Sequence, residues 1–576
     1  MGARDTYAIK PPAPTFAELF TPKLITLLRA GYSLPDFKAD AMAGLTVAIV
    51  ALPLSMAIAI GSGLSPDKGL FTAIVGGFLI SALGGSRFQI GGPAGAFIVL
   101  IAAIVERHGY DGLVLATLMA GAMMMAAGFL RLGTYIKYIP FPVTVGFTAG
   151  IAVIIMASQV KELLGLDIPA EPSALIPKLG VIWSSLGSID PATVAIAAAA
   201  IATIVALRRW QPRWPGMLIA VTLTTLIAAL FQIDVTTIGS RFGEVPRTLP
   251  APSLPQFELA KMLAIFPDAL AIALLGSIES LLSAVIADGM SGRKHRSNCE
   301  LVAQGFGNIA AVTFGGMCVT GTIARTATNI RAGARTPVSG MLHALYILLF
   351  MLVAAPLAAY IPLAALAGVL AVVAWNMAEK REFIGLLRTS WGDAAVLMAT
   401  FLLTIFVDLT TAIAVGTVLG AFLFLHRMAE TVEVAGNGPL IIEDTADATG
   451  ADRTVYTPAA ADSDLAVYRI SGAFFFGATS TVSAVLDRIG AHPKAFVLDF
   501  SAVPLVDSTA AKALHGFVEK LRREGTVVYF SGARSSVRRT LLQAGLRRPL
   551  VVYAASIEEA AAMRHASQQP ASSAGG

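Results

Sequence analysis

Long apolar runs separated by short polar connections make up the first three quarters of the chain. Because about 20 apolar residues in a helix cross the hydrocarbon of a bilayer, these runs predict membrane-spanning helices. Two runs are short and bounded by glycine, so we expect half-helices there, at 92–105 and 322–331. In all we expect fourteen spans, near 40–60, 70–84, 92–105, 112–130, 141–160, 192–207, 216–233, 262–287, 299–314, 322–331, 338–358, 362–376, 393–407 and 409–426.

After Arg427 the pattern changes to short β-rich runs that alternate with amphipathic helical stretches. This alternation predicts a small α/β domain. The last residues have the composition of a disordered tail. The organisation we predict is a cytoplasmic N-terminal segment (1–36), a transmembrane region (37–430) with two repeats (about 37–233 and 262–428), an acidic linker (431–464), the α/β domain (465–566) and the tail (567–576).

Composition agrees with a membrane protein, because 56% of the residues are hydrophobic and only 14% are charged, against about 25% charged in soluble domains. The net charge of +5 does not indicate nucleic-acid binding, because Lys and Arg gather in alternate short loops, as the positive-inside rule requires. We therefore expect a multi-pass protein of the inner (cytoplasmic) membrane with both termini cytoplasmic. The basic residues expected on the inner side are Arg131, Lys137, Arg208, Arg209, Arg213, Arg293, Lys294, Arg296, Arg331, Arg335, Lys380, Arg381 and Arg388.

The sequence offers little for catalysis or metal binding. Cys299 and Cys318 are the only cysteines and lie in or beside apolar segments, so we interpret them as packing residues. The histidines are scattered, and no nucleotide-binding loop or Ser/His/Asp set occurs. We expect no enzymatic activity, no cofactor and no metal.

Two glycine-rich segments occupy corresponding positions in the two halves: GGSRFQIGGPAGAF at 84–97 and GGMCVTGTIART at 315–326. In transporters with inverted repeats, short interrupted helices at matching positions mark the substrate site. With seven spans in each half, the second repeat is inverted relative to the first. Alternatively, these glycines only let helices pack closely, as the pair Gly146 and Gly150 is expected to do.

Each half-helix would begin inside the bilayer, where its first N–H groups lack intrahelical partners and its dipole is positive. Two such ends that face each other would form an anion site without a metal. We expect the first end to contribute Ala94, Gly95 and Ala96, and the second to contribute Ile323, Ala324, Arg325 and Thr326.

Two charged residues interrupt the apolar spans: Glu279 in the eighth and Arg325 at the start of the tenth. A charge at the membrane centre costs about 2.5–3.5 kcal/mol on insertion scales and persists when it is partnered or functional. We interpret Arg325 as the positive charge of the anion site. Glu279 would be a proton-coupling carboxylate, because burial favours its neutral form and a nearby arginine its charged form. The alternative is a static Glu279–Arg325 pair.

Pro53 cannot donate a helical hydrogen bond and predicts a kink in the first span. Ser55 and Met56 follow it and would line the substrate cavity, although a tolerated kink without site residues is an equal alternative. Ser283 is expected to support the site from the eighth span. Asp408, between two spans, is interpreted as a helix cap.

Three separated stretches resemble the SulP family, the sulfate permease or solute carrier 26 anion transporters. They are 44–97, 277–311 with its continuation 323–340, and the C-terminal motifs FFFGA (474–478) and VDSTAAKAL (506–514), which resemble that family's STAS domain. The resemblance covers nearly the whole chain. Among bacterial members it is greatest to the C4-dicarboxylate transporters, judged by GSRFQIGGP, AIVALPLSMAIAIGSG and the pair IESLL and IARTATN.

The resemblance implies that a core domain (spans one to four and eight to eleven) moves against a gate domain in an elevator-like cycle within a homodimer. The anion would bind between the third and tenth spans. Sodium-coupled bicarbonate members lack an arginine at the position of Arg325, which argues against a sodium site. Ala94 and Ala324 stand where some relatives carry hydroxyls, so only backbone contacts are expected there.

In the STAS-like region, Asp507, Ser508 and Thr509 open a helix after a strand. In anti-sigma antagonists, which this region also resembles, the corresponding loop carries a phosphorylated Ser or Thr. Ser508 and Thr509 are therefore a candidate phosphosite, and the domain a candidate docking point for a cytoplasmic partner. Helix capping is the favoured alternative, because Asp, Ser and Thr are the preferred N-caps.

Three functions remain open. The first is a proton-coupled symporter of small anions, with C4-dicarboxylates foremost. The second is a sulfate or bicarbonate carrier or an anion exchanger. The third is an anion-sensing receptor that signals through the STAS domain. The matched half-helices favour transport, because a sensor needs no site accessible from both sides of the membrane.

Overall fold

The computed structural model describes residues 15–135, 138–168, 171–172, 174–211, 214–436, 465–479, 482 and 493–568. The chain divides into two compact units, Met1–Val418 and Leu419–Gly576. Lys137, Arg213 and most of the predicted linker and tail lie outside the described residues, as does most of 480–492 within the predicted α/β domain.

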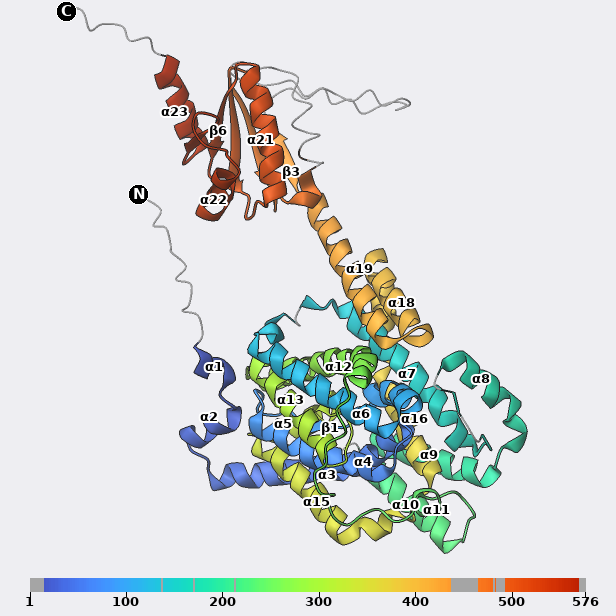
Figure 1. Cartoon of the computed structure of the whole chain (residues 1–576). Helices are drawn as coiled ribbons and strands as arrows, with labels where there is room; N and C mark the ends of the chain where they lie inside the picture. Colours follow the sequence, from blue (N-terminus) through green and yellow to red (C-terminus); the bar gives the residue numbers. More distant parts are fainter. Residues whose placement is uncertain are drawn as a thin grey trace, which may run out of the picture. The chain divides into compact units, whose positions relative to one another are not determined.

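The first half of the first unit is almost entirely helical (Figure 1). It contains α1 (Phe16–Phe20), α2 (Lys23–Ala30), α3 (Leu34–Gly61), α4 (Pro66–Phe71), the π-helical turn η1 (Thr72–Gly76), α5 (Gly77–Leu83), β1 (Gly91–Gly92), the 3-10 turn η2 (Gly95–Phe97), α6 (Ile98–Phe129), η3 (Leu132–Thr134), α7 (Phe141–Leu164), α8 (Leu175–Ser184), η5 (Leu186–Ser188), α9 (Pro191–Trp210), α10 (Gly216–Leu230) and α11 (Ile238–Phe242).

The second half repeats this pattern of long helices around one short strand. It contains α12 (Leu259–Ser291), α13 (Ser297–Thr313), β2 (Thr320–Gly321), α14 (Ile323–Arg331), α15 (Val338–Ala358), α16 (Leu363–Met377), α17 (Lys380–Thr389), α18 (Trp391–Phe406) and α19 (Leu409–Glu430), the last of which crosses the boundary between the units.

These helices confirm the polytopic helical fold and its two half-helices. Each expected span coincides with helical residues, and among the described residues nine helices are long and apolar enough to cross a membrane. The third and fourth spans form one helix, α6, interrupted at Gly109, where φ is 68° and ψ is −176°. Only glycine adopts this backbone readily. Pro53 lies inside α3 without ending it.

The helices pack in two groups that correspond to the expected core and gate. In the core group, α12 and α13 pack against α6, α15 packs against α3 and α5, and α14 packs against α3 and α12. In the gate group, α7 packs against α16 and α18, and α9 packs against α10 and α16. A Cβ on Gly146 would lie 2.6 Å from the carbonyl oxygen of Leu397, which confirms that this glycine allows close packing.

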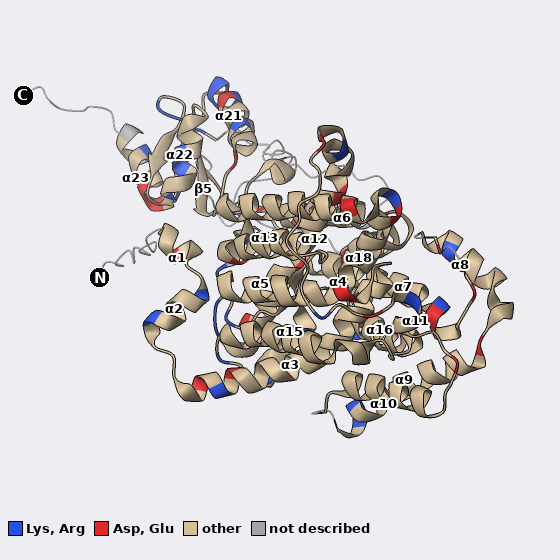
Figure 2. Cartoon of the chain, turned by 60° about the horizontal axis from the view of Figure 1, so that its bottom comes forward, with Lys and Arg blue, Asp and Glu red and all other residues tan. Residues whose placement is uncertain are grey.

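Charged side chains of the first unit gather at helix ends and connections, while the helix bodies are mostly uncharged (Figure 2). This is the distribution that a bilayer requires. Asp408 lies at one such helix end. Its carboxylate accepts a 2.8 Å hydrogen bond from the backbone N–H of Thr411, which confirms the capping role.

The second unit contains a five-stranded sheet in the order β3-β4-β5-β6-β7. The first pair is antiparallel and the other pairs are parallel, which confirms the α/β domain. Strand β3 consists of residues that we expected in the linker. It joins the sheet by main-chain pairing with β4, which requires no apolar pattern in the sequence. The elements are β3 (Glu433–Gly436), β4 (Leu465–Ser471), η6 (Phe476–Ala478), β5 (Ala495–Ala502), α21 (Ser508–Arg523), β6 (Val527–Ser531), α22 (Ser535–Gln543), β7 (Val552–Ala554) and α23 (Ile557–Gln568).

Candidate functional site

The two glycine-rich segments meet as a two-stranded antiparallel sheet. Gly91 of β1 pairs with Gly321 of β2, and Gly92 pairs with Thr320. The ladder continues one step further, because the N–H of Thr322 donates to the carbonyl of Ile90 at 3.0 Å. A helix starts soon after each strand: η2 begins at Gly95 after β1, and α14 begins at Ile323 after β2.

Glycine is required in these strands because side chains crowd them. A Cβ on Gly321 would lie 1.6 Å from Nε2 of Gln89, and a Cβ on Gly91 would lie 2.7 Å from Cδ1 of Ile80. A Cβ on Gly92 would lie 2.0 Å from Nη1 of Arg325. These glycines do allow close packing, and this packing lets the guanidinium of Arg325 lie against β1. Whether they also form part of an anion site stays a prediction.

Both helix ends present backbone N–H groups. In α14 the first intrahelical bond runs from the N–H of Thr326 to the carbonyl of Thr322. The N–H groups of Ile323, Ala324 and Arg325 precede it and have no intrahelical acceptor. On the other side Ala94 is the N-cap of η2, and Gly95 begins that turn. The expected backbone donors thus stand at the starts of η2 and α14.

Arg325 is buried, with 2% of its surface exposed. Its Nη2 donates to Oγ of Ser55 in α3 at 3.2 Å. Its Nε and Nη1 are buried without a hydrogen-bond partner. A buried guanidinium that uses only part of its donor set is costly unless another acceptor completes it. The arrangement favours a small anion as that acceptor.

Glu279 does not neutralise Arg325 by direct contact. No ion pair joins these two residues among the described parts of the chain, and Oε2 of Glu279 is buried without a hydrogen-bond partner. The helices that carry them, α12 and α14, do pack together. The alternative of a static Glu279–Arg325 pair is therefore not what the structure contains.

Ser283 and Thr326 lie side by side behind the helix ends. Oγ of Ser283 donates to Oγ1 of Thr326 at 3.3 Å, and Oγ1 of Thr326 also accepts the N–H of Ile90 at 3.1 Å. Thr326 thus links α14 to the segment before β1. Contact of Thr326 with a substrate and the supporting role of Ser283 stay predictions.

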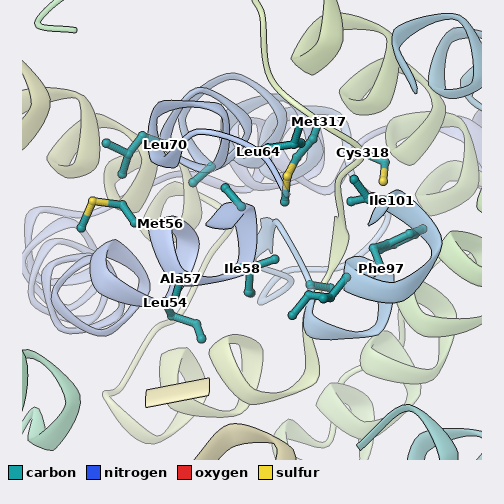
Figure 3. Close-up of a cluster of buried hydrophobic side chains, with 14 of the residues drawn as sticks. Leu54, Met56, Ala57, Ile58, Leu64, Leu70, Phe97, Ile101, Met317 and Cys318 are labelled. Atoms are coloured by element: carbon teal, nitrogen blue, oxygen red, sulfur yellow. The ribbon is translucent and has the colours of Figure 1, made fainter. Parts of the chain in front are cut away.

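Met56 and Ala96 belong to the large apolar cluster of the first unit, and Figure 3 shows Met56 among its buried side chains. Met56 is fully buried there. The structure therefore brings Ser55 to the guanidinium and places Met56 in the surrounding packing. Contact of Met56 with a substrate stays a prediction.

Two buried carboxylates fix the broken segments and were missed from sequence. Glu300 at the start of α13 accepts the N–H groups of Gly85 and Ser86 at 2.8 and 3.0 Å. Asp40 in α3 accepts the N–H groups of Arg335 and Thr336, just after α14. The signal for Glu300 was available, because it is an acidic residue in an apolar run. Its partners, over 200 positions away, were not.

In the second unit Asp507 is the N-cap of α21. Its Oδ1 accepts the N–H of Ala510 at 2.8 Å, and its Oδ2 accepts the N–H of Phe476 at 2.9 Å. This confirms the capping role for Asp507. Ser508 and Thr509 are exposed at the start of the helix, and their phosphorylation stays a prediction.

The chain resembles known families over both of its units. The family model described as the sulfate permease family matches residues 37–400, and the STAS domain model matches residues 456–560. "Putative sulfate transporter YvdB" of Bacillus subtilis is 39% identical over 520 residues, which are 90% of this chain and 95% of that protein. "Bicarbonate transporter BicA" of Synechocystis sp. is 30% identical over 519 residues, which are 88% and 90% of the two chains.

A solved structure shares the complete fold. The inward-facing structure of the murine Solute Carrier 26 family member A9 anion transporter matches 98% of this chain and 97% of its own, with a TM-score of 0.82. The sequence identity of this pair is 18%, so the likeness concerns the fold alone.

Proposed function

The chain belongs to the sulfate permease family, and we propose that it is a secondary transporter that takes up C4-dicarboxylates together with protons. That it is a multi-pass anion transporter follows from its family and its membrane helices. The substrate, the coupling ion and the mode of movement are our proposal. The single observation that carries it is the half-paired guanidinium of Arg325, which lies against Gly92 of the paired glycine-rich segments.

The choice of a carboxylate rests on the donor geometry. A guanidinium presents planar N–H donors that match the two oxygens of a carboxylate. The N–H groups at the starts of η2 and α14 add donors on either side. The motifs GSRFQIGGP and IARTATN resemble those of the C4-dicarboxylate members. The second carboxylate of such a substrate would interact with protein groups next to those that bind its first carboxylate.

A sulfate or bicarbonate carrier is the second candidate. The names of the two relatives, which refer to sulfate and to bicarbonate, favour it. The same donors suit these anions. The presence of Arg325 disfavours sodium coupling in either case, because a fixed cation would repel a sodium ion bound nearby.

Proton coupling is proposed for Glu279. Its Oε2 is buried, unpartnered and carried by a helix that packs on α14. The positive charge of Arg325 favours the charged form of the Glu279 carboxylate. A bound anion would offset this positive charge, so its arrival would promote uptake of a proton by Glu279. The two packing groups support an elevator-like movement of the core against the gate, within a homodimer.

Labelled-anion uptake into proteoliposomes tests the function. The purified chain would be offered labelled succinate, sulfate or bicarbonate at two pH values, with the other anions as competitors. We expect uptake of succinate that exceeds that of sulfate and bicarbonate and increases with an inward proton gradient. Sulfate or bicarbonate uptake that succinate does not inhibit would establish the second candidate. Binding without uptake of any anion would favour the receptor.

Arg325 variants test the site itself. Arg325→Lys keeps the positive charge but loses the planar set of N–H donors, and Arg325→Ala loses both. Since a hydrogen bond to a charged group contributes about 1.5–3 kcal/mol, we expect uptake efficiency to fall roughly 10- to 150-fold in the lysine variant and to vanish in the alanine variant. Arg331→Ala is the matched control, because Arg331 lies on the same helix but is exposed. Full uptake by Arg325→Ala would refute the proposed site.

A further inference from the structure

The C-terminal unit carries a group of arginines for which the transport site has no use. Between residues 525 and 556 the chain contains no acidic residue and no lysine. The arginines of this stretch are all exposed, and none joins an ion pair recorded for the described part of this unit. This arginine face consists of Arg534, Arg538, Arg539, Arg547 and Arg548.

The arginine face is built on α22 and the loop that follows it (Figures 1 and 2). Val537 and Leu541 are the buried residues on one side of α22. Arg538 and Arg539 are exposed on the other side. Leu542 lies beside them with 41% of its surface exposed. The surface is hollowed there by a cavity of about 590 Å³, lined by Ala533, Ser535, Arg538, Arg539, Leu542 and Gln543.

One arginine of the face is held in place. The guanidinium of Arg538 lies 4.8 Å from the centre of the Tyr553 ring in β7, a cation–π contact that limits its movement. The face therefore combines an oriented cation, uncompensated neighbouring cations and an apolar residue. One guanidinium group can donate two parallel hydrogen bonds to the oxygens of one phosphate, so a phosphate-bearing surface matches this chemistry.

We propose that the arginine face docks on the phosphate headgroups of anionic phospholipids in the membrane that holds the transporter. The chain itself supplies the reason to choose lipid. Helix α19, a candidate membrane span, ends at Glu430, and β3 of the sheet begins at Glu433. A domain of about 100 residues has a radius of gyration of about 13 Å, so this short tether keeps the whole domain near the bilayer.

Tethering makes the lipid headgroup the polyanion of highest local concentration. Anionic leaflets attract basic segments with about 1 kcal/mol for each Lys or Arg at the surface, or about a factor of five each. The exposed Leu542 would enter the interface, as the apolar residues of interfacial helices do. Docking would fix the orientation of the STAS domain relative to the membrane.

A fluorophore on the face tests this proposal. In the full chain reconstituted in vesicles, Gln543→Cys would be labelled; the native cysteines are both buried. We expect a quencher on the lipid headgroups to act on this label when the vesicles contain phosphatidylglycerol, and much less with phosphatidylcholine alone. Salt should reverse the effect, because attraction to the surface is screened within about 8–10 Å at ordinary ionic strength. A label at Ala562→Cys, exposed on α23, should not respond to the lipid.

Charge variants separate docking from folding. Arg538→Glu with Arg539→Glu should weaken the lipid-dependent quenching at least 25-fold, as two contributions of about a factor of five are lost. Arg538→Lys with Arg539→Lys should retain most of it, and Arg523→Glu on α21 should have no effect. Equal quenching in both lipids, or insensitivity to the double Glu change, would overturn the proposal. So would a response to dissolved inorganic phosphate or ATP in neutral vesicles without a response to phosphatidylglycerol, since the face would then bind free phosphates.

Discussion

Arg325 concentrates the proposed chemistry in one side chain. Its guanidinium is buried, donates to Ser55 and leaves two nitrogens without partners. Burial of a cation without a direct partner is expensive, and no ion pair with Glu279 relieves this cost among the described residues. The two charges are held near each other on packed helices but apart. In the coupling that we propose, this separation would let an anion bound at Arg325 and a proton on Glu279 affect each other through the same electrostatic field.

Replacement of Glu279 by Gln tests the coupling at this scale. We expect Glu279→Gln to abolish the dependence of anion uptake on the proton gradient, because the amide cannot take up and release a proton. Counterflow exchange of labelled for unlabelled anion should persist. The measurement is proteoliposome uptake with and without an imposed pH difference, and Glu106→Gln, an exposed residue, is the control. Unchanged proton dependence in Glu279→Gln would remove this residue from the coupling.

The cap of α21 gives a second prediction at the residue scale. Asp507→Ala should lower the free energy of unfolding of the C-terminal unit by about 1 kcal/mol, since an N-cap side chain contributes about 0.5–2 kcal/mol. Ser508→Ala should change it by no more than a few tenths, because Ser508 is exposed and Asp507 forms the cap. Denaturant titration of the full chain, followed by a probe in the sheet, measures both. Equal effects of the two substitutions would mean that Ser508 shares the cap.

At the scale of elements, the site depends on two helices that start in the middle of the fold instead of crossing it. The β1–β2 ladder joins their starts. Glu300 holds the segment before β1 to α13, and Asp40 holds the segment after α14 to α3. Each broken segment of one repeat is thus fixed by a helix of the other repeat or of the first span. The N–H groups of Gly85, Ser86, Arg335 and Thr336 are satisfied in this way, while those at the start of α14 have no intrahelical acceptor.

Gly92→Ala tests the closeness of strand and guanidinium. The added methyl would lie 2.0 Å from Nη1 of Arg325, so the side chain must move away from β1. We expect at least a tenfold increase in the KM for the anion with a normal elution profile in detergent, because the guanidinium is a flexible end that can shift without unfolding the helix. Gly180→Ala, which meets nothing within 4 Å, is the matched control. An unchanged KM in Gly92→Ala would show that the anion does not use this position of Arg325.

At the scale of the whole molecule, the chain is an inverted pair of seven-helix repeats followed by a STAS domain. The repeats contribute to both packing groups, so neither group can form from one repeat alone. This explains why the segments at 84–97 and 315–326 are distant in sequence yet adjacent in space. The placement of Lys and Arg predicts the orientation in the membrane, with both termini cytoplasmic.

Labelling from one side of the membrane tests that orientation. We expect Gly187→Cys, in the exposed turn η5, to react with an impermeant maleimide added to intact cells. Arg388→Cys, exposed at the end of α17, should react only after the membrane is opened. The unaltered chain is the control, because Cys299 and Cys318 are buried. The reverse pattern would place both termini outside the cytoplasm.

The pattern of apolar runs was sufficient to locate the spans, the two half-helices and the change to an α/β domain. Length against bilayer thickness and the alternation of β and α stretches are local properties, so a sequence carries them completely. The same holds for Arg325 and Glu279, which were conspicuous because a charge in an apolar run is costly. The sequence did not predict that the third and fourth spans form one helix interrupted at Gly109, because the presence of a glycine does not specify its backbone φ and ψ angles.

The sequence alone therefore determined the set of helices and strands. It also singled out Arg325 and Glu279, the charged residues in apolar runs that packing alone does not explain. The tertiary structure decided which of them meet. It separated Glu279 from Arg325, turned Ser55 toward the guanidinium and Met56 into the apolar cluster, and gave Glu300 and Asp40 their backbone partners. These outcomes depend on contacts between residues up to about 300 positions apart, and such contacts arise only when the two repeats pack against each other.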